Sequence, residues 1–168
     1  VASNGCELSP DPDAIYVQTP NNGGVDAANC GVVQAPCATI AFGLEQAVTE
    51  SKARVRVAEG AFRETVTLVE GIDLLGGHQR INWERNPSLY ASVIFGADSD
   101  PLHKAAVKAL DIRNTTRFDG FTVNAEPVLF DGNSYGIYIK DSNEELQFTN
   151  NRIFASNGGI GSDGDSGI

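Results

Sequence analysis

Several residue types are scarce in this chain of 168 residues, and each scarcity excludes something. It holds only two histidines and three cysteines, and no Cys-x-x-Cys pair, so we do not expect a zinc site. No apolar run is long enough to cross a membrane as a helix. With 12 Lys and Arg against 22 Asp and Glu, the formal charge of −10 argues against nucleic acid and anionic membranes as partners.

The clearest pattern lies in residues 36–77. Thr39 suits a helix N-cap, and apolar residues at helical spacing after it predict an amphipathic helix over residues 40–50. Residues 54–58 and 65–68 then alternate between apolar and polar, as strands with one buried face do. Glu-Gly pairs end these segments, and the connections are too short for helical crossovers between parallel strands. A meander of β-hairpins also fits such connections.

A correspondence within the second half of the chain favours a solenoid with a period of about 20 to 30 residues. Three pairs of residues correspond: Phe118 with Phe148, Val123 with Ile153, and Ile112 with Ile139. The first coil of a solenoid has an open edge, and the helix over residues 40–50 is expected to cover it. The predicted fold class is therefore all-β, a right-handed parallel β-helix (solenoid) with an N-terminal amphipathic capping helix.

Motifs in the first half resemble those of a known family. In order, they are Ile15-Tyr16-Val17, a Gly/Asn/Asp loop, Pro36-Cys37-Ala38-Thr39-Ile40 at the helix start, and the run from Val55 to Glu64. They resemble the N-terminal end of bacterial proteins with the pectin lyase-like parallel β-helix, with Phe62 in place of the common tyrosine. The resemblance runs from residue 14 to the end of the chain. It implies a fold but no single function, because lyases, hydrolases, epimerases, adhesins and fibre proteins share it.

The domain organisation follows from the same patterns. Residues 1–13 are polar with two prolines and are expected to be an extended or disordered tail. Residues 14–168 are expected to form one parallel β-helix domain of about three coils. No terminal cap is recognisable, so we expect this domain to be the N-terminal part of a longer solenoid, or its C-terminal edge to be covered by another chain. The absence of methionine leads us to expect a processed or trimmed product.

The three cysteines are Cys6, Cys30 and Cys37. Cys30 and Cys37 flank a short loop before the predicted helix, and a disulfide there would hold a segment that has little core of its own. A pair of buried thiols is the alternative. Cys6 lies in the N-terminal tail or pairs with one of the other two.

A loop after Gly77 is the candidate ligand-binding region. It contains the only tryptophan of the chain together with other aromatic and basic residues: His78, Arg80, Trp83, Arg85 and Tyr90. Aromatic rings flanked by arginines can stack on sugar rings and hold uronate carboxylates. The alternative is that Trp83 and Tyr90 pack this loop onto the side of the fold.

Calcium is the one metal that we consider, and no other cofactor is expected. The Gly-, Asp- and Ser-rich end of the chain contains Asp163 and Asp165, for which we consider a calcium site or, as the simpler interpretation, a flexible turn. Asp26 lies in a second glycine-rich loop, where a single carboxylate is too few for an oxygen cage.

No catalytic cluster is recognisable, so we lean towards a non-enzyme for this segment. Glycoside hydrolysis needs two cooperating carboxylates, and Asp73, Asp111, Asp119 and Asp141 are not expected to pair densely with a basic partner. His78 and His103 have no Ser or Cys nucleophile motif nearby.

The predicted function is a structural, adhesive or glycan-binding β-solenoid that is secreted, periplasmic or at the cell surface. Its expected partners are an acidic or other polysaccharide and a second copy bound through the open C-terminal edge. The alternative is the N-terminal part of a polysaccharide lyase or hydrolase whose active site lies beyond Ile168.

Overall fold

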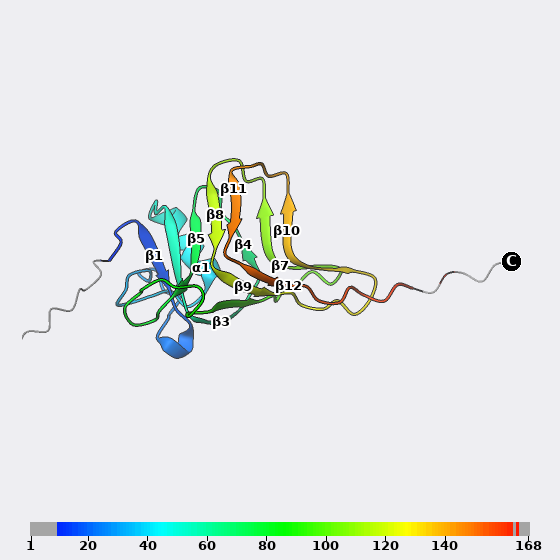
Figure 1. Cartoon of the computed structure of the whole chain (residues 1–168), viewed down its shortest axis with the longest axis horizontal. Coiled ribbons are helices and arrows are strands. Elements are labelled where there is room, and N and C mark those ends of the chain that lie inside the picture. The colour runs from blue at the N-terminus through cyan, green and yellow to red at the C-terminus, as the bar shows by residue number, and fades with distance from the viewer. Residues whose placement is uncertain (1–9, 163, 165–168) are drawn as a thin grey trace, which may run out of the picture.

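The computed structural model describes residues 10–162 and residue 164, and it contains three parallel β-sheets, one α-helix and one short 3-10 helix (Figure 1). The helices are η1 (Pro20–Asn22) and α1 (Ile40–Thr49). The five-stranded sheet has the order β1 (Ala14–Val17), β2 (Arg54–Ala58), β5 (Asp73–His78), β8 (Thr116–Asp119), β11 (Leu146–Thr149). The four-stranded sheet consists of β3 (Gly60–Arg63), β6 (Ser92–Phe95), β9 (Phe121–Asn124) and β12 (Arg152–Phe154). The three-stranded sheet consists of β4 (Val66–Thr67), β7 (His103–Leu110) and β10 (Asn133–Lys140).

The helix α1 begins where the sequence predicts it and ends one residue earlier. Thr39 is the N-cap, and its Oγ1 accepts a hydrogen bond from the Phe42 N–H at 3.2 Å. The Glu64 carboxylate accepts the N–H groups of Ile40 and Ala41, both at 2.9 Å. These bonds satisfy donors that a helix start leaves without partners. The helix contacts β1, β2 and β4, so it closes one end of the sheets.

The core is built from columns of apolar side chains that run across neighbouring strands. In the five-stranded sheet, the paired residues are Ile15, Val55, Leu74, Phe118 and Phe148. The first four of these are at most 1 % exposed. Shorter columns run through the other sheets: Phe62, Ile94, Val123 and Ile153 in one, and Val66, Val107 and Ile137 in the other. Each fully buried side chain of this kind contributes about 1.5–3 kcal/mol through removal from water.

The predicted fold class, a right-handed parallel β-helix (solenoid), is wrong. The structure is three parallel sheets of five, four and three strands with one short helix. The prediction assumed equivalent coils, but paired residues along the five-stranded sheet are 40, 19, 44 and 30 positions apart. Strand lengths are also unequal, from two residues in β4 to eight in β7 and β10. Strand patterns report which face is buried, and they do not fix how much chain lies between one strand and its partner.

Two of the three predicted residue correspondences are confirmed. Phe148 pairs with Phe118 and Ile153 pairs with Val123. The third is wrong, because Ile139 pairs with Ala109 and Ile112 lies after the end of β7. Across the described part of the chain, no helix has the length and apolar character needed to cross a membrane.

Candidate functional site

The loop between β5 and β6, which the sequence proposed for ligand binding, places its largest aromatic ring in the interior. Trp83 is 6 % exposed and lies edge-on against Tyr16, with ring centroids 4.7 Å apart. His78 is 2 % exposed, and its Nδ1 lies 3.3 Å from the Val57 carbonyl oxygen. Burial, together with the nearby positive charges of Arg56 and Arg85, lowers the pKa of His78 from 6.5 to about 4. This imidazole is therefore neutral at neutral pH.

Arg80 and Arg85, the two arginines of the same loop, are both exposed, and only Arg85 has a buried ion-pair partner among the described residues. Arg85 donates from Nε to the Gly76 carbonyl at 3.0 Å and forms an ion pair with the buried Asp119. Arg80 is exposed and Tyr90 is half-buried. The structure therefore does not gather the five proposed residues around one open cavity, and ligand binding by this loop stays a prediction.

Three of the four aspartates considered from the sequence have basic partners that the sequence did not indicate. Asp119 pairs with Arg85, Asp73 pairs with Arg117 at 3.3 Å, and the exposed Asp141 pairs with Lys140 at 3.8 Å. The expectation that these aspartates stand apart from basic residues is wrong. Burial alone would raise the pKa of Asp119, but hydrogen bonds from Thr149 and Arg85 outweigh it and hold that pKa below its ordinary value. The Asp73–Arg117 pair links the neighbouring strands β5 and β8, and the Arg85–Asp119 pair links the β5–β6 loop to β8.

The calcium hypothesis falls on Asp163 and Asp165, which lie outside the described residues. Within residues 10–162 and 164, no group of three or more His, Cys, Asp or Glu side chains is arranged to hold a metal ion. Asp26 accepts hydrogen bonds from the N–H groups of Ala38 and Thr39, at 2.8 and 3.1 Å. Its carboxylate therefore fixes the turn before α1.

The disulfide between Cys30 and Cys37 is confirmed. Both residues are buried, and their Cα atoms are 4.9 Å apart. The bond closes a short loop, residues 31–36, within the segment between β1 and α1. Cys6 lies outside the described residues.

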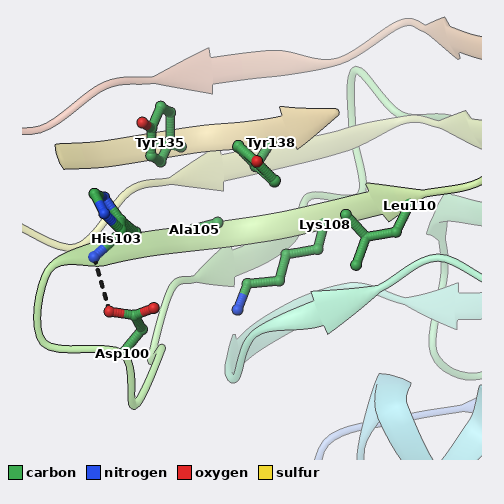
Figure 2. Close-up of a pocket in the computed structure, with 7 residues that line it drawn as sticks. All are labelled: Asp100, His103, Ala105, Lys108, Leu110, Tyr135 and Tyr138. Carbon is green, nitrogen blue, oxygen red and sulfur yellow. Dashed lines mark hydrogen bonds between the residues drawn. The ribbon is translucent and has the colours of Figure 1, made fainter. Parts of the chain in front are cut away.

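An open groove of about 360 Å³ lies on the outer face of the three-stranded sheet, and we name it the tyrosine groove (Figure 2). Seven residues line it: Asp100, His103, Ala105, Lys108, Leu110, Tyr135 and Tyr138. Five come from or border β7, and the two tyrosines come from the neighbouring strand β10. Figure 2 shows both tyrosine rings on the same side of the sheet as the side chains of Lys108 and His103.

The two tyrosines share a face because β10 departs from regular alternation. Residues three apart on a strand ordinarily point to opposite faces. Tyr135 and Tyr138 instead both line the groove, with ring centroids 5.3 Å apart and ring planes at 58°. Between them lies the buried Gly136, where a Cβ would come within 2.5 Å of the Ile153 side chain on β12. Glycine at this position therefore lets β12 approach while both rings face outward.

Strand β7 departs from alternation at the same level. Ala105 pairs with Tyr135 and Lys108 pairs with Tyr138, and both line the groove. The two residues between them, Ala106 and Val107, are both fully buried. The irregularity is thus shared by the two strands, so their pairing stays in register across it.

One ion pair anchors the lysine of the groove. Lys108 Nζ lies 2.7 Å from Asp98 Oδ2, and the Asp98 side chain is 6 % exposed. Asp98 also accepts the N–H groups of Ala105 at 3.0 Å and Asp100 at 3.2 Å. Burial alone would raise the pKa of Asp98, but the hydrogen bonds from Lys108 and the backbone outweigh it and lower that pKa. Asp98 is therefore a carboxylate at neutral pH, and it fixes the position of Lys108.

The polar end of the groove is formed by a tight turn. Asp100 Oδ1 accepts the N–H groups of Leu102 at 2.8 Å and His103 at 2.9 Å. These bonds lower the pKa of Asp100, so this residue is also a carboxylate at neutral pH. His103 is exposed, and its Nδ1 lies 3.3 Å from the Asn133 side-chain nitrogen. This end therefore offers a carboxylate, an imidazole and an amide close to the aromatic rings.

Sequence reasoning missed the tyrosine groove. It identified residues 97–104 as a polar loop and described residues 136–139 as a strand, without connecting the two segments. The available signal was Tyr-Gly-Ile-Tyr, in which a glycine inside a strand marks an irregularity that can turn two aromatic rings to one face. Comparisons of the chain with protein-family models, curated proteins and solved structures found no match. The resemblance to pectin lyase-like proteins accordingly stays a prediction from the sequence.

Proposed function

We propose that this protein is a glycan-binding module that holds a short stretch of sugar chain in the tyrosine groove. The observation that carries the proposal is the pair of half-buried rings of Tyr135 and Tyr138 on one face of an open groove. A half-buried ring on a rigid strand presents apolar area at little entropic cost, and the apolar face of a sugar ring matches it. The volume of the groove lies at the lower end of the range for small-ligand sites, about 300–1,000 Å³.

The polar groups around the rings suit sugar hydroxyls. Lys108 provides N–H donors, and Asp100 provides a carboxylate acceptor. His103 supplies either a donor or an acceptor, depending on its tautomer. A few polar groups around an apolar surface are what fixes the orientation of a bound small ligand.

Binding fits these groups better than hydrolysis does. A glycosidase needs one carboxylic acid that keeps its proton near neutral pH, which requires a raised pKa. The pKa values of Asp98 and Asp100 are both lowered, by the hydrogen bonds described above. Both groups therefore serve as acceptors rather than as proton donors.

A secreted, periplasmic or cell-surface location belongs to the same proposal. A disulfide such as Cys30–Cys37 persists in oxidising compartments and is rare in reducing ones. Glycans are also exposed to proteins in those compartments. The net charge of −10 agrees with a partner other than nucleic acid.

Calorimetric titration with a panel of oligosaccharides tests the proposal. The Tyr135→Ala and Tyr138→Ala variants should each lose at least about tenfold in affinity, because loss of a stacking ring removes about 1.5 kcal/mol or more of binding free energy. Phe130→Ala is the matched control, because Phe130 is an aromatic residue that is 69 % exposed and lies outside the groove. Tyr90→Ala tests the β5–β6 loop instead. Loss of binding in Tyr90→Ala, with full binding in both groove variants, would assign the site to that loop and contradict the proposal.

Self-association through the outer strands is a second candidate. Strands β10, β11 and β12 each form the last strand of a sheet. Apolar side chains on two of them are about half exposed: Ile139 at 52 %, Ile153 at 49 % and Phe154 at 54 %. Exposed apolar edge strands can pair with a second chain. Light scattering over a range of concentrations tests this, and a constant monomer mass would contradict it.

A further inference from the structure

We infer that the ligand of the tyrosine groove is an uncharged glycan, and that polyuronates such as pectate and alginate are excluded by the charge of the groove. The inference rests on the proposed glycan-binding function. It departs from the aromatic and basic set seen in the sequence, which pointed to uronate carboxylates. Three features of the groove support the inference. The lysine already forms an ion pair, one oxygen of the Asp100 carboxylate is not used by the backbone, and the two aromatic rings are uncharged.

The lysine of the groove is already neutralised. Among the seven lining residues, Lys108 is the one Lys or Arg, and its Nζ contacts the buried Asp98 at 2.7 Å. A uronate carboxylate would have to share a cation whose charge Asp98 already offsets. Its attraction to Lys108 would therefore be opposed by repulsion from the Asp98 carboxylate. A sugar hydroxyl can accept one Lys108 proton while the ion pair stays intact.

The remaining charge of the groove is negative. Asp100 Oδ1 is used by two backbone N–H groups, and its Oδ2 has no hydrogen-bond partner among the residues that the structure describes. The charges of Lys108 and Asp98 cancel one another, so the Asp100 carboxylate adds a negative charge to the groove that no paired cation offsets. The chain as a whole carries −10. A polyanion is therefore repelled both inside the groove and on approach to it.

The same carboxylate favours hydroxyl groups. The spare Asp100 oxygen can accept a hydrogen bond from a sugar O–H, and charge-assisted bonds of this type are the stronger ones. Tyr135 and Tyr138 bind through apolar area and require no charge on the ligand. The groove thus contains groups that recognise hydroxyls and apolar ring faces, and it has no uncommitted cation for a carboxylate.

The test compares oligosaccharides that differ only in oxidation at C6. Suitable pairs are β-1,4-glucan and its C6-oxidised form, β-1,4-mannan and β-1,4-mannuronan, and carboxyl-reduced and native α-1,4-galacturonan, all of equal length. We expect the neutral member of at least one pair to bind about tenfold or more tighter than its acidic counterpart. Its affinity should change by less than about twofold between low and physiological salt, because no charge on the ligand is screened.

Two variants sharpen the test. Asp100→Asn removes the net negative charge at an exposed turn. It should reduce the ratio of the affinities for the neutral and acidic oligosaccharides by about threefold. Asp98→Asn removes the ion-pair partner of Lys108 and should reduce that affinity ratio further. Asp100→Asn keeps the inference testable even if Asp98→Asn fails to fold, because Asp100 is not part of the core.

The outcomes separate the two proposals. Equal or tighter binding of the acidic members, with an affinity that falls as salt is added, overturns the exclusion of polyuronates and leaves glycan binding standing. Binding of the acidic and neutral members that does not respond to Asp100→Asn also overturns it. No binding to either member of any pair would overturn both the inference and the proposed function.

Discussion

Two regions of this molecule place aromatic rings beside cationic side chains, and they do so to opposite effect. In the β5–β6 loop, Trp83 is 6 % exposed and Arg85 is paired with a buried aspartate. On the outer face of β7 and β10, Tyr135 and Tyr138 remain half-buried around an open groove. The first region uses its aromatic ring for packing, and the second leaves its rings available to a ligand. Residue types alone do not distinguish these cases, because burial depends on which strands lie underneath.

The largest expected difference between the regions is in stability. Trp83→Ala should reduce the free energy of unfolding by about 3–5 kcal/mol, because it removes a buried ring and leaves a cavity. Tyr138→Ala, the matched change in the groove, should cost less than about 1.5 kcal/mol, because that ring is partly exposed already. Urea denaturation of both variants measures the difference. Equal losses would show that the two rings are equally structural.

The next prediction concerns pH and the buried imidazole beside Trp83. The pKa of His78 is about 4 when folded and 6.5 ordinarily, so the unfolded chain takes up a proton before the folded protein does. The stability from this residue is present above pH 6.5 and should be lost between pH 6.5 and 4, by about 3 kcal/mol in total. Denaturant unfolding measured at several pH values tests this.

The matched variant for that experiment is His78→Gln, which cannot titrate. Its free energy of unfolding should change much less over the same pH window, whatever its absolute stability. Asp98 and Asp119 have pKa values below the ordinary 3.8. The stability that they contribute is therefore present above pH 3.8 and is lost only as the pH falls below that value. An identical pH dependence in the variant and the parent would contradict the assignment to His78.

A third prediction compares the two ion pairs. Arg85→Met should lower the free energy of unfolding by about 2 kcal/mol, because the buried Asp119 keeps its hydrogen bonds from Thr149 and Asn150 but loses its cation. Lys108→Met should lower the free energy of unfolding by about 1 kcal/mol, because two backbone N–H groups still bond to Asp98. The groove variant should lower glycan affinity, and the loop variant should not. If calorimetric titration instead shows lower glycan affinity in Arg85→Met and unchanged affinity in Lys108→Met, the ligand site lies in the β5–β6 loop and not in the groove.

The smallest expected effect separates rings from hydroxyls within the groove. Tyr135→Phe and Tyr138→Phe keep the aromatic surface and should hold glycan affinity within about threefold of the parent. Replacement by alanine should lose tenfold or more, as above. If the phenylalanine variants lose as much as the alanine variants, the hydroxyl groups carry the binding and stacking does not.

Local patterns in the sequence were reliable where one strand or one helix turn determined the result. The alternation in residues 54–58 placed Val55 and Val57 in the core, and Thr39 marked the start of the helix. These signals depend on the period of the element and on a single cap, so they can be recognised within a short stretch of sequence.

The pairing of strands was harder to predict because it depends on the length of the turns between them. Phe118 with Phe148 and Val123 with Ile153 are each 30 positions apart and do pair. Ile112 and Ile139 are 27 positions apart, and Ile139 pairs with Ala109 instead. The fold class failed for the same reason, since the spacing between paired strands ranges from 19 to 44 positions.

The groove escaped prediction because two departures from regular geometry create it. Tyr135 and Tyr138 reach the same face through the irregularity at Gly136, and Asp100 and His103 reach them from a separate loop. The loop around Trp83 looked more like a binding site because its aromatic and basic residues are close in sequence. Burial of His78 and Trp83 and the pairing of Arg85 with Asp119 are tertiary facts with no local signature.

The most direct test of the account is one titration comparison. The Tyr135→Ala/Tyr138→Ala double variant and the parent protein are titrated with the neutral oligosaccharide that the parent binds best, after equal unfolding midpoints have been established. The account predicts that the double variant shows no measurable binding. Equal affinity in the two proteins would contradict the central claim that the groove between β7 and β10 is the ligand site.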